Sequence, residues 1–187
     1  MRKYIANTLW WLVGFLLSHL VAVCAVAETP FLSAWDEINI GSQVAQGIGQ
    51  DLFYIEDKQE KYALEQIQQL APQQWEKSTV STPNFGYTNS SYWFRVSLQA
   101  PDDRLDKLLA IQYALLDHIE LYVVEEGQVI QSYVTGDTLE FSQRPIRHRD
   151  FLFPIQFESK QRVTLFLKVK TEGSLQLPIT RWERGQF

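Results

Sequence analysis

The chain has 187 residues, of which 45% are hydrophobic and 21% charged, and its net charge at pH 7 is −5. A chain of this size buries roughly two-thirds of the surface that its unfolded form exposes, enough for a stable core without disulfides. The acidic balance argues against a nucleic-acid-binding function, because binding to phosphates requires a basic surface.

The first 27 residues have the three features of a cleavable signal peptide. Arg2 and Lys3 supply positive charge, residues 9–23 form an almost unbroken apolar run, and the Ala-Val-Ala sequence at 25–27 suits a signal peptidase. We therefore expect residues 1–27 to be a signal peptide and the mature protein to be periplasmic.

Two other kinds of N-terminal segment compete with this interpretation. An uncleaved anchor needs about 20 apolar residues, whereas the run here is shorter and is interrupted by Ser18 and His19. A lipoprotein would be anchored through Cys24, but a lipidated cysteine normally follows Gly, Ala or Ser, and here Val23 precedes it. The sequence favours cleavage.

Cleavage changes the charge and the cysteine content of the mature chain. It removes two of the 17 basic residues, so 15 remain against 22 acidic ones and the net charge becomes −7. It also removes Cys24, the only cysteine, so no disulfide can form. Such a chain suits the bacterial periplasm, and full secretion stays open.

The N-terminal part of the mature chain carries few strand signals. Residues 28–50 contain three glycines and little periodicity, which predicts an irregular segment. Residues 52–55 indicate a short strand. A helix is expected at 58–70, because Asp57 and Glu60 have the spacing of a capping box and apolar residues follow at helical intervals.

From residue 92 onward the apolar residues recur with period two, the pattern of β-strands with one buried face. Turn residues separate the strands at regular intervals, which predicts a sandwich or jelly roll rather than βαβ units. We expect one all-β domain at 51–187, a jelly-roll β-sandwich with one short N-terminal helix. The expected strands in this region are 92–99, 108–113, 119–123, 129–135, 151–157, 163–169 and 175–179.

Several short motifs follow one another along the chain in a recognisable order. They are Asn84-Phe85-Gly86-Tyr87, Ser91-Tyr92-Trp93-Phe94-Arg95, Asp117-His118-Ile119-Glu120-Leu121-Tyr122, Gly136-Asp137, Arg144-Pro145-Ile146-Arg147-His148-Arg149 and Phe151-Leu152-Phe153-Pro154. Together, over about residues 52–182, they resemble the type 2 extracellular domain of bacterial seven-transmembrane receptors with diverse intracellular signalling modules (7TMR-DISM).

This resemblance implies a jelly roll similar to carbohydrate-binding modules. It also implies a periplasmic sensor placed ahead of seven transmembrane helices and a histidine kinase or diguanylate cyclase output. The sequence here ends at Phe187 without those parts. We therefore expect either a sensor domain without its transmembrane and output modules or a free-standing periplasmic relative.

Trp93 and Arg95 are the first candidate binding residues. If Tyr92 and Phe94 face the core, Trp93 and Arg95 share the opposite face of their strand. An indole packs against the C–H face of a sugar, and a guanidinium donates to hydroxyls or to a carboxylate. The alternatives are a reversed register, with Trp93 in the core, or coverage of this face by helix 58–70.

Residues 144–149 concentrate positive charge in an otherwise acidic chain. This loop could hold an anionic group such as a uronate, a phosphate or a carboxylate. Local pairing with nearby acidic residues such as Asp150, which would orient the loop, is an equal alternative. Arg144 and Arg147 are favoured over Arg149 because the resemblance to the 7TMR-DISM family includes those two positions.

Tyr122 is the fifth candidate residue. It could extend an aromatic strip with Trp93 if their strands face the same way. A plain cross-strand aromatic pair gives the same pattern and is the preferred interpretation.

Catalysis and cofactors find little support in the residues. Asp117 and Glu120 are three apart on a strand, so they project to opposite faces and cannot form the paired carboxylates of a glycosidase. His118 and His148 each have an aspartate nearby but no third ligand at transition-metal spacing. We expect no cofactor, and the sequence leaves a structural calcium ion open.

The sequence thus predicts a non-enzymatic periplasmic ligand-binding module. A carbohydrate or sugar acid is the expected ligand, bound by Trp93, Arg95, Tyr122, Arg144 and Arg147. The main alternative is a protein-interaction or dimerisation module, whose partner would be a second copy or another receptor. An exposed apolar patch would favour that alternative, whereas a groove with aromatic and arginine side chains would favour a small ligand. A glycoside hydrolase is the third and least supported possibility.

Overall fold

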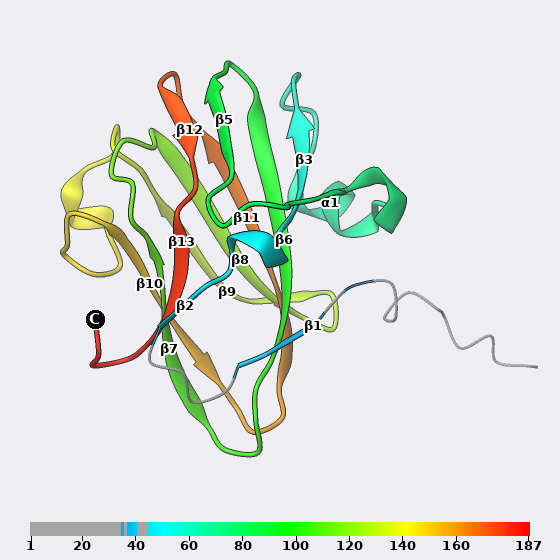
Figure 1. The fold of residues 1–187 in the computed structure, drawn as a ribbon, viewed down its shortest axis with the longest axis vertical. Helices are drawn as coiled ribbons and strands as arrows, with labels where there is room; N and C mark the ends of the chain where they lie inside the picture. Colours follow the sequence, from blue (N-terminus) through cyan, green and yellow to red (C-terminus); the bar gives the residue numbers. More distant parts are fainter. Residues whose placement is uncertain (1–34, 36, 41–44) are drawn as a thin grey trace, which may run out of the picture. The chain divides into compact units, whose positions relative to one another are not determined.

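A computed structural model describes Trp35, residues 37–40 and residues 45–187 (Figure 1). The predicted signal peptide lies outside the described residues. Within them, no helix is long and apolar enough to cross a membrane.

The larger of two main sheets has seven strands, in the order β4-β3-β6-β11-β8-β9, with β1 also beside β6. All of its pairings are antiparallel except that of β1 with β6. Its strands are β1 (Glu37–Asn39), β3 (Phe53–Asp57), β4 (Glu76–Lys77), β6 (Ser91–Gln99), β8 (His118–Glu125), β9 (Gln128–Thr135) and β11 (Arg162–Lys170).

The smaller sheet has four strands in the order β10-β7-β13-β2, and a separate two-stranded ribbon joins β12 to β5 (Figure 1). These elements confirm the predicted all-β sandwich with one α-helix. The remaining elements are β2 (Ala45–Gly47), β5 (Asn84–Tyr87), β7 (Leu105–Ile111), β10 (Phe151–Phe157), β12 (Ser174–Gln176), β13 (Ile179–Glu183), α1 (Leu64–Gln69) and the 3₁₀ turns Gly49–Asp51, Pro72–Gln74 and Phe141–Gln143.

Alternate residues of the central strands fill the space between the two sheets. Phe94 of β6, Leu121 of β8, Phe153 of β10 and Leu167 of β11 are each at most 3% exposed and belong to one apolar cluster. The cavity beside them measures about 10 Å³, the size of a single water molecule. A larger ligand does not fit in this cavity.

The helix begins later than the sequence predicted. Asp57 ends β3, and its carboxylate accepts hydrogen bonds from the backbone N–H groups of Lys61 and Tyr62, both at 3.0 Å. The chain therefore turns at this point, and α1 starts only after Ala63, whose N–H donates to Gln66 Oε1 at 2.9 Å. The side chain that was expected to cap the helix instead stabilises the turn before it.

The segment 28–50, predicted to be irregular, supplies short strands within its described residues. Glu37–Asn39 pairs in parallel with Ser97–Gln99 of β6, and Ala45–Gly47 pairs with β13. Ile40 and Ile48 are fully buried in the main core. Strands of three residues are too short to show a period, so their tertiary pairing rather than a local pattern determines them.

Leu121 lies at the centre of β8 with no exposed surface. Replacing it in Leu121→Ala is expected to lower the free energy of unfolding by about 2–5 kcal/mol, because it removes buried apolar contacts and leaves a cavity. Urea unfolding measures this loss. The matched control is Leu115→Ala, where the leucine is 59% exposed, and its expected change is within about 0.5 kcal/mol. Equal losses in both variants would contradict this description of the core.

Candidate functional site

The outer face of the larger sheet carries three of the five predicted site residues. The strand register places Trp93 and Arg95 of β6 on the face opposite Phe94, as predicted, and Tyr122 of β8 on that same face. Two adjacent rows of side chains cross this face from β3 to β8: Ile55, Trp93, Lys168 and Glu120 in one, and Phe53, Arg95, Phe166 and Tyr122 in the other.

A second apolar cluster covers part of this face. Leu64 and Ile67 of α1 belong to one buried apolar cluster with Trp35, Trp75 and Trp93. Trp93 is therefore only 1% exposed. A sugar cannot stack on a fully buried indole. For Trp93 the second alternative therefore applies, in which the helix covers this face of the sheet. The predicted aromatic contact for a sugar is not available at this residue in the structure.

Tyr122 lies against Trp93 on the same face. Their ring centroids are 6.3 Å apart with an interplanar angle of 21°, which is a stacked arrangement. Tyr122 keeps part of its surface exposed, whereas Trp93 does not. The cross-strand aromatic pair that the sequence favoured for Tyr122 is present.

Arg95 is a partly buried cation close to two aromatic rings. Its guanidinium carbon lies 3.5 Å from the ring centroid of Trp35 and 5.7 Å from that of Phe166. Among the described residues, no hydrogen bond or ion pair reaches this guanidinium, and its Nε is buried without a partner. Burial lowers the pKa of Arg95 to about 10. An unpaired, partly desolvated cation is costly and is able to bind a carboxylate or another anion.

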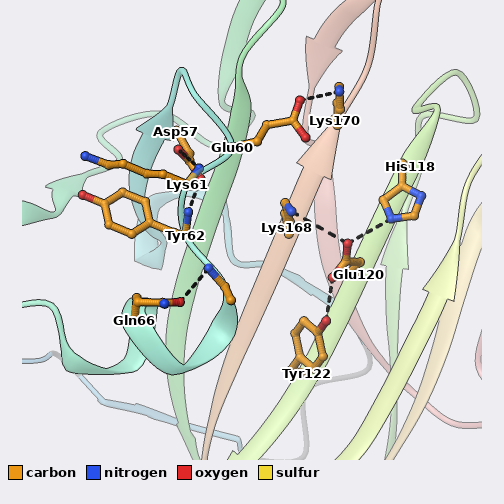
Figure 2. A network of polar contacts seen from close by, with 11 residues as sticks. Asp57, Glu60, Lys61, Tyr62, Gln66, His118, Glu120, Tyr122, Lys168 and Lys170 are labelled. Atoms are coloured by element: carbon orange, nitrogen blue, oxygen red, sulfur yellow. Dashed lines mark hydrogen bonds and ion pairs between the residues drawn. The ribbon is translucent and has the colours of Figure 1, made fainter.

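Glu120 is at the centre of a polar network on the neighbouring strands (Figure 2). The Tyr122 hydroxyl donates to Glu120 Oε2 at 2.5 Å, and His118 Nε2 lies 3.0 Å from Oε1. Lys168 Nζ lies 3.9 Å from the same Oε1 atom and 5.6 Å from the Trp93 ring centroid. Three side chains from β8 and β11 therefore converge on one carboxylate.

The pKa values in this network follow from its burial and its hydrogen bonds. Burial raises the pKa of Glu120, but hydrogen bonds from Tyr122 and His118 and the charge of Lys168 outweigh this effect, so the pKa ends below its ordinary value. Burial and the bond to Glu120 raise the pKa of Tyr122, and the charge of Glu65 on α1 adds to the increase. Glu120 is held as a carboxylate and Tyr122 as a neutral donor.

The turn between β3 and α1 forms one side of this polar surface. Glu60 in that turn makes an ion pair with Lys170 of β11 (Figure 2). The side chains of His118 and Lys170 are 36% and 43% exposed, so solvent reaches the surface beside the turn. We call the surface formed by His118, Glu120, Tyr122, Lys168 and Lys170 the open polar face.

Arg144 and Arg147 lie elsewhere, in the loop that precedes β10 of the smaller sheet. Arg144 donates to the backbone carbonyls of His148, at 2.6 Å, and Arg149, and its guanidinium carbon lies 4.4 Å from the Phe151 ring centroid. Arg144 therefore organises the loop through carbonyls. The local pairing with Asp150 that the sequence offered as the alternative is made by its neighbours, with Arg149 Nε 3.5 Å from Asp150 Oδ1 and His148 Nδ1 3.9 Å from Asp150 Oδ2. Arg147 is exposed. The structure does not bring these two arginines together with Trp93, Arg95 and Tyr122.

Lys168 and Lys170 were not among the predicted site residues, and Glu120 was predicted only as a possible catalytic acid. A signal was present, because the two lysines alternate with the buried Leu167 and Val169 on β11. The described residues contain no cluster of three His, Cys, Asp or Glu side chains able to hold a metal ion.

The family model described as 7TMR-DISM extracellular 2 matches residues 49–183. The chain belongs to this family. It is therefore an extracellular sensor domain of the receptor type, with a periplasmic or extracellular location. The match includes both main sheets from β3 onward and all residues of the open polar face.

Comparison with other proteins adds little to this 7TMR-DISM assignment. A search of curated proteins found no match. Among solved structures, the mosquito-larvicidal Cry4Aa toxin from Bacillus thuringiensis is 9% identical with a TM-score of 0.32, over 56% of this chain and 21% of the toxin chain. The aligned part is about a fifth of the toxin, and so weak a likeness carries no argument about fold or function.

Replacing the carboxylate in Glu120→Gln is expected to destabilise the sensor domain in a pH-dependent way. Because the folded pKa lies below the unfolded one, the carboxylate stabilises the fold above the ordinary pKa and loses this effect as the pH falls through the folded value. At neutral pH the expected loss in the free energy of unfolding is about 1–3 kcal/mol, and it should shrink at acidic pH.

Urea unfolding of the wild type and Glu120→Gln at neutral pH and near pH 3.5 measures this difference. Glu172→Gln, at an exposed position, is the control and should match the wild type at both pH values. A gap between wild type and Glu120→Gln that stays constant with pH would show that the network does not stabilise the ionised carboxylate.

Proposed function

We propose that this 7TMR-DISM domain is a periplasmic ligand-binding sensor that binds a carbohydrate, with a sugar acid as the favoured ligand. The binding surface is the open polar face together with Arg95, which lies in the same row of side chains as Tyr122 with Phe166 between them. The observation that carries the proposal is Arg95 itself, a partly buried cation that has no counter-charge among the described residues. A carboxylate on the ligand would supply the missing charge.

The open polar face offers the groups that recognise sugar hydroxyls. Glu120 keeps acceptor capacity on its two oxygens beyond its three partners in the network, while Lys168 and Lys170 have donors, and His118 is able to do either. The partly exposed ring of Tyr122 adds an apolar surface beside them. Such a combination of planar aromatic and paired polar groups suits a ring that carries several hydroxyls.

The placement of the acidic residues supports a binding role without catalysis. Asp117 Oδ2 accepts the backbone N–H of Glu172 at 2.7 Å, so this carboxylate is used to hold a turn. Glu120 is occupied by Tyr122, His118 and Lys168. A glycosidase needs two acids facing each other across the bound sugar, and these two do not form such a pair.

Calorimetric titration of the exported protein with paired saccharides tests this proposal. Oligosaccharides containing uronate are expected to bind at least about 10-fold more tightly than their neutral counterparts, a difference of about 1.4 kcal/mol. Arg95→Gln should remove that difference and leave neutral binding in place. Glu120→Gln should weaken both, because it removes a hydroxyl acceptor and disturbs the network.

Arg149→Gln is the matched control for loss of one positive charge, since Arg149 is 85% exposed and lies on the other sheet's loop. Binding of no saccharide at all would overturn the ligand class. Unchanged binding in Arg95→Gln would contradict the assignment of the site. If only Arg147→Ala weakened binding, the site would instead lie in the loop before β10.

A further inference from the structure

A cavity of about 390 Å³ lies at one end of the smaller sheet, where β7 begins and β13 ends. Its volume falls in the range of pockets that hold small molecules. None of its lining residues belongs to the sheet that carries the open polar face, so the cavity is separate from the proposed saccharide site. The lining residues are Arg104, Leu105, Asp106, Glu183 and Arg184.

The cavity forms because β13 turns away before it covers the start of β7. The pairing of these strands ends at Glu183 opposite Lys107. The N–H of Arg184 then donates to the Asp106 carbonyl at 3.3 Å. The chain turns at Gly185, whose φ of +95° lies in the left-handed region that favours glycine. The first residue of β7 therefore pairs with β10 on one side and, among the described strands, has no partner on the other.

Arg184 and Asp106 place two opposite charges side by side in this cavity. Arg184 Nη1 lies 3.4 Å from Asp106 Oδ2, and the two side chains are 55% and 41% exposed. A guanidinium has five N–H donors, and a carboxylate accepts through both oxygens. Within the described part of the chain, the Arg184 side chain makes no other hydrogen bond. Each group therefore keeps unused hydrogen-bonding capacity that solvent reaches.

Glu183 and Arg104, the other charged lining residues, have partners outside the cavity. Glu183 lies opposite Lys107, which is only 2% exposed, and its charge acts on that buried ammonium group. Arg104 Nε lies 3.7 Å from Glu158 Oε1 in an exposed ion pair. The neighbouring guanidinium and carboxylate described above are therefore the part of the lining most available to a ligand.

We propose that this cavity binds a small zwitterion, an α-amino acid with an aliphatic side chain. The carboxylate and ammonium groups of an amino acid share one carbon, so its two charges are close enough to meet Arg184 and Asp106 at once. The ligand carboxylate would bind the guanidinium, and the ligand ammonium would bind the Asp106 carboxylate. Leu105, the apolar residue of the lining, would contact the aliphatic side chain.

The two neighbouring charges disfavour ligands that carry only one charge. An anion at Arg184 would also lie near the Asp106 carboxylate, and a cation at Asp106 would lie near the guanidinium, so like charges would repel in each case. A zwitterion places an opposite charge at both groups. Because these groups are partly exposed, each contact contributes little, and we expect a dissociation constant of roughly 10 μM to 1 mM.

Calorimetric titration of the exported protein with three ligands of one carbon skeleton tests this proposal. L-Leucine has both charges, 4-methylpentanoate lacks the ammonium group, and 3-methylbutylamine lacks the carboxylate. Leucine is expected to bind at least about 10-fold more tightly than either of the others, because only leucine pairs with both protein groups. This comparison uses the wild type alone, so it does not depend on the folding of any variant.

Substitution of each charged partner in turn tests the assignment of the site. Arg184→Gln should weaken leucine binding at least about 10-fold and leave leucine no advantage over 3-methylbutylamine, since the carboxylate has lost its partner. Asp106→Asn should likewise remove the advantage over 4-methylpentanoate. The matched control is Arg162→Gln on β11, because Arg162 is 64% exposed and its Nε lies 3.5 Å from Glu37 Oε1. This variant loses a comparable ion pair and should bind leucine like the wild type.

The proposal would be overturned by any of three results. These are no binding of leucine up to about 10 mM, equal binding of leucine and either single-charge analogue to the wild type, and equal effects of Arg184→Gln and Arg162→Gln. The test is independent of the saccharide proposal, since oligosaccharides containing uronate should bind Arg184→Gln as they bind the wild type.

Discussion

The antiparallel pairing of β6 with β11 is the contact on which both faces of the larger sheet depend. It places Phe94 opposite Leu167 on the inner face and Arg95 opposite Phe166 on the outer face. A shift of one residue would exchange these faces and move a guanidinium into the core. The apolar filling of the sandwich and the covering of Trp93 by α1 both require this one register.

Glu120 and Arg95 show two opposite electrostatic arrangements on the same face. Glu120 has three partners and its pKa is held below the ordinary value, so the network is satisfied within the protein. Arg95 has aromatic neighbours but no carboxylate among the described residues, and burial lowers its pKa. The first arrangement provides rigidity to the polar surface. The second leaves the positive charge of Arg95 without a partner, and an anionic ligand would be able to pair with it.

The sequence predicted the long strands β6, β8, β9, β10 and β11 and the shared face of Trp93 and Arg95, because a period of two is a local property of the chain. Residues 175–179, predicted as one strand, are divided between β12 and β13, which belong to different sheets. It could not show that Trp35 covers this face, since the covering residue is distant in sequence and no local pattern identifies its contacts. The same applies to Arg144, whose partners are backbone carbonyls that any residue type supplies. The open polar face was missed because its residues come from β8 and β11, which only the register brings together.

The aromatic neighbours of Arg95 also restrict the direction from which this side chain is approached. Trp35 lies over one side of the guanidinium plane at 3.5 Å, and Phe166 is the second ring near it, at 5.7 Å. The N–H bonds of a guanidinium point within its plane. An acceptor must therefore arrive edge-on, and a flat group with two oxygens in one plane matches this opening better than an acceptor approaching from above. The contact with Trp35 would thus favour a planar carboxylate in the proposed ligand over a bulkier acceptor.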